Sequence, residues 1–135
     1  MTYPISDLDS ITQDHIRLLK SIGIRTTEKL LEAACTAKKR KLLAGKTKVP
    51  EQQWLSWANN ADRMRIKGVG HDNSKLLQAI GVVTVRELKY RNPRHIAEAM
   101  REINNKRKLV RLLPTENAIR RWITAAGKLE PKIRY

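Results

Sequence analysis

The chain has 135 residues, of which 41% are hydrophobic and 4% aromatic, and its net charge is +15. This length fits one ordinary domain with an aliphatic core, so neither a metal ion nor a disulfide is needed for folding. A surface with so large an excess of positive charge repels itself unless a polyanion or counterions neutralise it, which makes nucleic acid the leading candidate partner.

Several classes of protein are excluded by what the sequence lacks. Cys35 is the only cysteine, which excludes an internal disulfide and a cysteine-based zinc cluster and is compatible with a reducing cytoplasm. No apolar run approaches the roughly 20 residues that span a bilayer, and the first residues lack the basic start and apolar stretch of a signal peptide. We therefore expect a cytoplasmic protein with no membrane partner.

The first half of the chain has the pattern of short helices separated by turns. Gly23 lies where a helix needs a left-handed stop, and Thr26 is suited to cap the helix that follows. After Pro50, apolar side chains recur on one face of a further helix, at Trp54, Trp57, Ala58, Ala61 and Met64. We expect both tryptophans in the core, where they cannot serve as stacking platforms for bases.

The second half continues with the same kind of signals. Gly81 repeats the helix stop, residues 84–87 form a capping box from Thr84 to Glu87, and Asn92 precedes a first-turn proline. A last helix has one apolar face made of Ala118, Ile119, Trp122, Ile123 and Ala126. The only β-branched run is residues 81–85, too short to pair alone, so the sequence predicts an all-α fold.

An internal repeat links the two halves. Asp14, Leu18, Leu19, Ile22, Gly23, Thr26 and Leu30 recur without a gap as Asp72, Leu76, Leu77, Ile80, Gly81, Thr84 and Leu88. Such self-similarity is typical of a duplicated helical unit. The sequence therefore predicts two pseudo-repeated units, residues 1–64 and 65–135, packed as one compact body because no flexible linker separates them.

The second unit begins with a two-glycine turn between helices. At Gly68-Val69-Gly70 the chain must reverse, and glycines let the backbone adopt positive φ and approach a ligand without a Cβ in the way. The following helix, starting near His71, adds free N–H groups and the positive end of its dipole. Together these groups suit a DNA phosphate oxygen, with Val69 tucked into the core.

This turn resembles the helix-hairpin-helix family, in which a hydrophobic-x-Gly-hydrophobic-Gly turn, followed by a small residue and a leucine, binds the sugar-phosphate backbone without reading sequence. Ser74 and Leu77 stand at the last two positions. Over its whole length, including residues 61–70 and 106–111, the chain is similar to a bacterial family of small tandem helix-hairpin-helix proteins known only as a domain of unknown function. The resemblance implies a SAM-like helical fold but no established activity.

Carried over to this sequence, the resemblance implies which residues contact phosphate. The amides of Gly68 and Gly70 would bind the oxygens, nearby charge would come from Arg63, Arg65, Lys67 and Lys75, and His71 would face phosphate at the helix start. Lys67 stands where the family often has proline, and Asp72 places a carboxylate at the same helix start. In the first unit the equivalent turn, residues 10–12, has no glycine and acidic neighbours, so we expect it to pack rather than bind.

Charge is unevenly distributed along the chain. Residues 1–32 have a net charge of −1, whereas residues 33–135 carry +16. Two basic runs stand out, one made of Lys38, Lys39, Arg40 and Lys41 and the other of Lys106, Arg107 and Lys108. Each run is either a solvated helix face or part of a polyanion surface, and the second reading requires that the runs converge in space.

Enzymatic signatures are weak. The segment Gly45-Lys46-Thr47 ends like a nucleotide-binding phosphate loop, but Arg40 stands where the first glycine is required and no strand precedes it. His15, His71 and His95 lack the spacing of zinc ligands. Asp7 and Asp9 are the only close carboxylates, a poor set for a metal-dependent nuclease. We therefore expect no enzyme, no metal and no cofactor.

Two hypotheses follow for function. The first is sequence-independent binding of nucleic acid, DNA rather than RNA, through phosphates at the Gly68–Gly70 hairpin and adjacent lysines and arginines. The alternative is a protein-interaction module, or an RNA-binding protein, built on degenerate helix-hairpin-helix repeats. In that case residues 1–32 would bind a partner or a second copy of the chain. For the glycines alone, a purely geometric role as a helix connection is also open.

Overall fold

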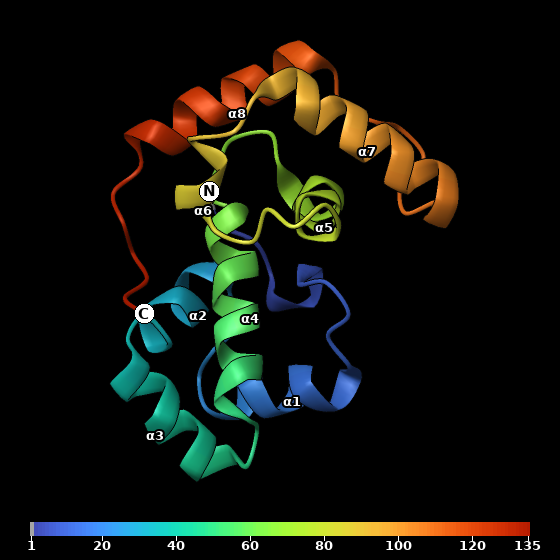
Figure 1. The fold of residues 1–135 in the computed structure, drawn as a ribbon. Helices are drawn as coiled ribbons and strands as arrows, with labels where there is room; N and C mark the ends of the chain where they lie inside the picture. The colour runs from blue at the N-terminus through green and yellow to red at the C-terminus, as the bar shows by residue number, and fades with distance from the viewer. Residues whose placement is uncertain (1) are drawn as a thin grey trace. The chain divides into compact units, whose positions relative to one another are not determined.

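The computed structural model describes residues 2–135 and consists of α-helices joined by turns (Figure 1). In chain order the elements are η1 (Ile5–Asp7), α1 (Gln13–Ser21), α2 (Thr27–Ala33), α3 (Ala37–Thr47), α4 (Glu51–Arg63), α5 (Gly70–Ala79), α6 (Val85–Leu88), α7 (Pro93–Arg107) and α8 (Glu116–Lys128). Extended pairing within the described residues is limited to an isolated bridge between Pro4 and Thr26. The all-α fold predicted from the sequence is confirmed.

The helices group into two compact units. Unit 1 consists of Met1–Asp62 together with Pro131–Tyr135, and unit 2 consists of Arg63–Glu130. Each unit has its own hydrophobic core. None of the helices within residues 2–135 has the length and apolar character that crossing a bilayer requires. The interpretation of the two halves as copies of one unit stays a prediction.

The core of unit 1 is built around the apolar face of α4. Trp54 and Trp57 are buried there, with their rings edge to face and 5.1 Å between centroids. The C-terminal segment is joined to this unit by hydrogen bonds: the amide of Arg134 donates to the carbonyl of Cys35 (2.7 Å), and the hydroxyl of Tyr135 donates to Asn59 (2.7 Å). The sequence prediction that both tryptophans are core residues is confirmed.

Unit 2 packs α7 and α8 against each other, with α5 against α7 and α6 against α8 (Figure 1). Its core includes Val69, Leu77, Met100, Ile119 and Trp122, each at most 3% exposed. The helix starts are fixed locally. The Thr84–Glu87 capping box is present as predicted, and the side chain of Asn92 accepts bonds from two first-turn amides of α7.

The two predicted helix stops have the same geometry. Gly23 after α1 has φ +87° and Gly81 after α5 has φ +88°. The residue after each glycine returns its amide to a carbonyl five positions back, from Ile24 to Leu19 (2.8 Å) and from Val82 to Leu77 (2.9 Å). Only glycine adopts this left-handed conformation at little cost, and the returning bonds satisfy carbonyls at the helix end.

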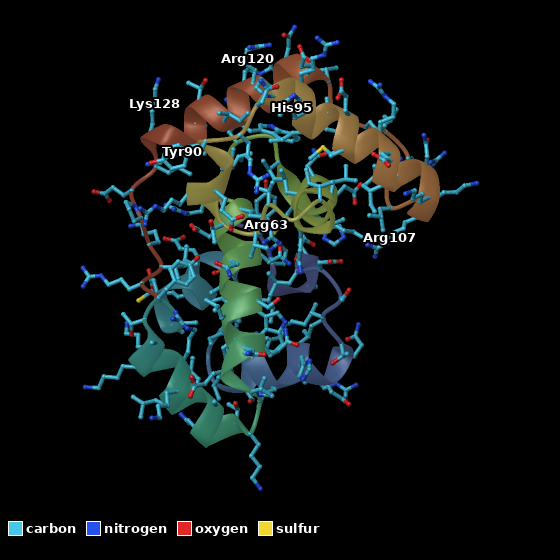
Figure 2. The ribbon with its side chains drawn as sticks, in the orientation of Figure 1. Arg63, Tyr90, His95, Arg107, Arg120 and Lys128 are labelled. Atoms are coloured by element: carbon cyan, nitrogen blue, oxygen red, sulfur yellow. The ribbon has the colours of Figure 1, made fainter. Side chains whose placement is uncertain are left out.

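A buried arginine holds unit 2 together at the turn between α4 and α5. Arg63 is 1% exposed and lies at the end of α4 (Figure 2). Its guanidinium donates three hydrogen bonds: Nε to the hydroxyl of Ser74 (3.0 Å), Nη1 to the carbonyl of Val83 (2.8 Å) and Nη2 to Oε1 of Gln78 (2.8 Å). These partners lie on α5 and on the segment before α6, so one side chain fixes both relative to the turn.

This geometry corrects one sequence prediction. The resemblance to the helix-hairpin-helix family implies that Arg63 supplies charge to a phosphate at the hairpin. The structure instead directs its guanidinium inward, where the acceptors of Ser74, Gln78 and Val83 use its donors. Arg63 is therefore a structural residue of unit 2 and does not belong to the phosphate-binding set.

Replacing Arg63 by methionine tests this role. Arg63→Met keeps much of the side-chain volume but leaves buried acceptors without a donor, so the free energy of unfolding should fall by about 3 kcal/mol. Urea denaturation followed by circular dichroism measures the change. The control is Arg121→Met on α8, an exposed arginine of the same unit, which should change stability by less than about 0.5 kcal/mol. Equal effects of the two substitutions would contradict the structural role.

Candidate nucleic-acid interface

The hairpin between α4 and α5 is shaped by two glycines and anchored by a valine. Gly68 has φ +89° and Gly70 has φ +61°, both in the left-handed region. Between them Val69 is 2% exposed and packs into the core of unit 2, and its amide donates to the carbonyl of Ile66 (3.1 Å). The sequence prediction that Val69 enters the core is confirmed. The side chain of Val69 is therefore unavailable to a ligand. Its role is to anchor the turn to the core of unit 2.

The amides of the two glycines are without protein acceptors. Gly68 is exposed and Gly70 is half-buried, and neither N–H donates to another residue within the described part of the chain. The carbonyl of Gly68 accepts a weak bond from the side chain of Asn73 (3.4 Å), which holds the turn against the first turn of α5. Two donors are thus offered to solvent at the positive end of a helix dipole.

The start of α5 also differs from other helix starts in this chain. Side chains of Thr12, Thr26, Thr36, Thr84, Asn92 and Thr115 accept bonds from first-turn amides of α1, α2, α3, α6, α7 and α8, respectively. Val69, which precedes α5, provides no side-chain cap. Because uncapped first-turn amides need an acceptor, the start of α5 is open to an anion from solution.

Two lysines and an arginine surround this turn, together with His71 and the carboxylate of Asp72. Lys67 and His71 are exposed and Lys75 is half-buried. Arg65 is half-buried and donates from Nη2 to the carbonyl of Glu130 (3.0 Å), so it is held at the side of the turn. The exposed carboxylate of Asp72 lies 4.0 Å from Nε2 of His71. Lys67 and Lys75 are consequently the cations best placed for a phosphate near the hairpin.

The first basic run lies on α3 in unit 1 and is divided by burial. Lys38, Lys39 and Lys41 are exposed. Arg40 is only 4% exposed and donates to the carbonyls of Ala34 (2.8 Å) and Arg134 (2.8 Å). The prediction of Arg40 as a contact residue is therefore wrong: it fastens the C-terminal segment of unit 1. The three lysines form an exposed basic strip on the helix.

The second basic run ends α7 in unit 2. Lys106, Arg107 and Lys108 are all exposed, and Lys106 pairs with Glu102 at 3.7 Å. Figure 2 shows Arg107 at the opposite end of unit 2 from Lys128. The hairpin lies beside α8, since Gly68 approaches Trp122 and Arg65 binds the carbonyl of Glu130. The run is therefore distant from the end of α8 that adjoins the hairpin.

One set of basic residues is absent from the sequence predictions. Arg120, Arg121 and Lys128 lie on the exposed face of α8, around an open hollow of about 380 Å³ that Thr124 and Ala125 also line. The apolar spacing of α8 identifies its buried face, and the same spacing implies a polar face opposite to it. The sequence could therefore have identified these basic residues from their place on the polar face of α8.

A matched pair of glycine substitutions tests the hairpin geometry. In Gly68→Ala the new Cβ would meet Nε1 of Trp122 at 3.4 Å on a backbone with φ +89°, so the free energy of unfolding should fall by about 1–3 kcal/mol. Gly127 lies within α8, with nothing within 4 Å of an added Cβ, and Gly127→Ala should raise stability by about 0.5 kcal/mol. Thermal unfolding followed by calorimetry distinguishes them, and a neutral Gly68→Ala would contradict the geometry.

Comparison with known proteins places the chain in a family. No curated protein and no solved structure showed a significant match. A family model described as "Domain of unknown function (DUF4332)" matches residues 9–129, which include the hairpin and most of both units. Because the match covers most of the chain, this protein belongs to the DUF4332 family.

Proposed function

We propose that this protein is a non-enzymatic DNA-binding protein that holds the sugar-phosphate backbone at a helix-hairpin-helix turn. The observation that carries the proposal is the pair of unsatisfied glycine amides at Gly68 and Gly70, at a helix start that no side chain caps. Backbone amides and a helix N-terminus bind phosphate oxygens directly. They read no base edge, so binding through them is independent of sequence.

The surrounding charge supplies most of the affinity. The exposed Lys67 and half-buried Lys75 flank the hairpin, and the chain as a whole carries +15. Cations that neutralise phosphates release condensed counterions, so the affinity for duplex DNA should fall steeply as salt rises. The lysines of α3 and the run Lys106–Lys108 would add contacts of the same non-specific kind wherever they reach the polymer.

A protein-interaction role is the alternative, and the charge of residues 1–32 favours it. This segment has a net charge of −1 and therefore lacks the basic character of the rest of the chain. Its turn around Ser10 has no glycine, and Thr12 already caps α1 by accepting from the amide of His15 (3.1 Å). Such a turn offers little to phosphate. If this role is the main one, the pure protein will not bind plain duplex DNA at low or moderate salt.

Charge reversal beside the hairpin tests the DNA-binding proposal. In Lys67→Glu/Lys75→Glu the affinity for a fully paired duplex should fall at least about tenfold. The slope of log K against log salt should become shallower by about 0.9 for each phosphate that the variant no longer neutralises. Fluorescence anisotropy with a labelled duplex of arbitrary sequence, titrated at several salt concentrations, measures both quantities.

A charge-matched control separates local contact from net charge. Arg17→Glu/Lys20→Glu changes the net charge equally, but on α1 of unit 1, where both side chains are exposed. This control should bind nearly as well as the unmodified protein. Equal reductions of affinity in the two variants would mean that the hairpin has no special role. A similar affinity for RNA duplexes or single strands would point to RNA as the partner.

A further inference from the structure

The loop between α7 and α8 presents a leucine to solvent. Leu112 is 86% exposed, the largest exposed fraction among the large hydrophobic side chains of the described residues, and its neighbour Leu113 is 37% exposed. Isolated exposed leucines are common on protein surfaces. Two further features of this loop, its anchoring and its charge, distinguish Leu112 from a residue that is exposed by chance.

The loop is held in place on both sides of Leu112. Before it, the side chain of Asn104 accepts from the amide of Val110 (3.0 Å) and donates to the carbonyl of the same residue (3.1 Å). The amide of Lys108, at φ +49°, donates to the carbonyl of Asn104 (2.8 Å). After it, Thr115 caps α8. Leu109 and Val110 pack against the core of unit 2, so the loop is anchored on both sides of Leu112.

The charge around Leu112 is mostly positive, although Glu102 pairs with Lys106 and Glu116 begins α8. Lys106, Arg107, Lys108 and Arg111 are exposed, and residues 103–115 contain no acidic residue. A polyanion that also offers an apolar interior to the leucine is therefore the partner whose charge and polarity complement this loop best. Nucleic acid has the negative charge and the apolar interior, because its phosphates lie outside a stack of bases. Proteins that bend DNA insert leucine and similar side chains between base steps in this way.

Other occupants fit less well. An amphipathic segment that binds an anionic membrane buries a broad apolar face, whereas here Leu112 stands with a single partly exposed neighbour. A second copy of the chain would bring its own net charge of +15 against this basic loop. Charge complementarity therefore favours nucleic acid over both.

We propose that Leu112 is a wedge that inserts into the base stack of DNA where stacking is already weak, as at a mismatch or a branch point, while Lys108 and Arg111 bind the flanking phosphates. The proposal rests on the proposed DNA binding and adds a substrate class to it. Unstacking costs least where pairing is already disturbed. The hairpin would bind any backbone, and the wedge would select distorted sites.

A duplex that carries 2-aminopurine beside a mismatch tests the wedge, because the fluorescence of this base rises when it unstacks. Unmodified protein should raise the fluorescence and bind the mismatched duplex more tightly than a fully paired one. Leu112→Ala should remove most of the fluorescence rise and weaken binding to the mismatched duplex by about tenfold, the effect of removing one buried leucine side chain. Its affinity for the paired duplex and its salt slope should not change.

The matched control is Leu42→Ala, which removes the 66% exposed leucine of α3, itself next to the lysine strip. This variant should behave like the unmodified protein. If Leu112→Ala keeps the full fluorescence rise and the preference for the mismatch, the wedge is refuted while backbone binding stands. If the unmodified protein binds neither duplex, the proposed function fails and the wedge with it.

Two further outcomes identify other occupants and would overturn the wedge. Leu112-dependent binding of phosphatidylserine vesicles, with no change in 2-aminopurine fluorescence on DNA, would assign the loop to a membrane surface. Sedimentation could instead detect self-association of the protein. If Leu112→Ala abolishes this self-association, the loop is an interface between copies of the chain.

Discussion

The hairpin depends on one buried guanidinium. A charged group this deep in a protein is stable only when its donors are satisfied, and Arg63 has acceptors at Ser74, Gln78 and Val83. Ser74 is completely buried, so the hydroxyl cannot exchange this partner for water. The bonds hold Arg63, the middle and last turn of α5 and the segment before α6 in one arrangement. The turn that contains Gly68 and Gly70 connects Arg63 to α5, so both of its ends are held in place.

In the proposed function, the backbone and the side chains at the hairpin have different roles. Gly68 and Gly70 have positive φ angles and amides without an acceptor among residues 2–135, and the buried Val69 between them anchors the turn. Rigid donors lose little entropy when they bind an anion. Lys67 provides positive charge close to these donors. Because its side chain is flexible, it does little to fix the orientation of a bound phosphate. In our proposal the turn therefore positions a phosphate and the lysines add strength that depends on salt.

Local signals in the sequence made the helix boundaries predictable. The burial of charged residues could not be predicted in this way. The stops at Gly23 and Gly81 and the capping box from Thr84 follow from conformations and bonds within a few residues, so the sequence alone indicates them. Arg40 and Arg63 look like surface cations in the sequence because their acceptors, such as the carbonyls of Arg134 and Val83, are distant along the chain. The exposed leucine at 112 has no sequence signature either, because an apolar residue in a loop can be buried or exposed and only the structure shows which.

In the proposed function, the amides of Gly68 and Gly70 donate hydrogen bonds to a DNA phosphate. Nuclear magnetic resonance of the ¹⁵N-labelled protein, titrated with a fully paired duplex, observes these two N–H groups directly. We predict that their proton resonances move downfield together as DNA is added, and that the shift disappears at high salt. Resonances of Lys38 to Lys41, or of Lys106 to Lys108, that move while both glycine signals stay fixed would contradict the claim, because DNA would then bind without the hairpin.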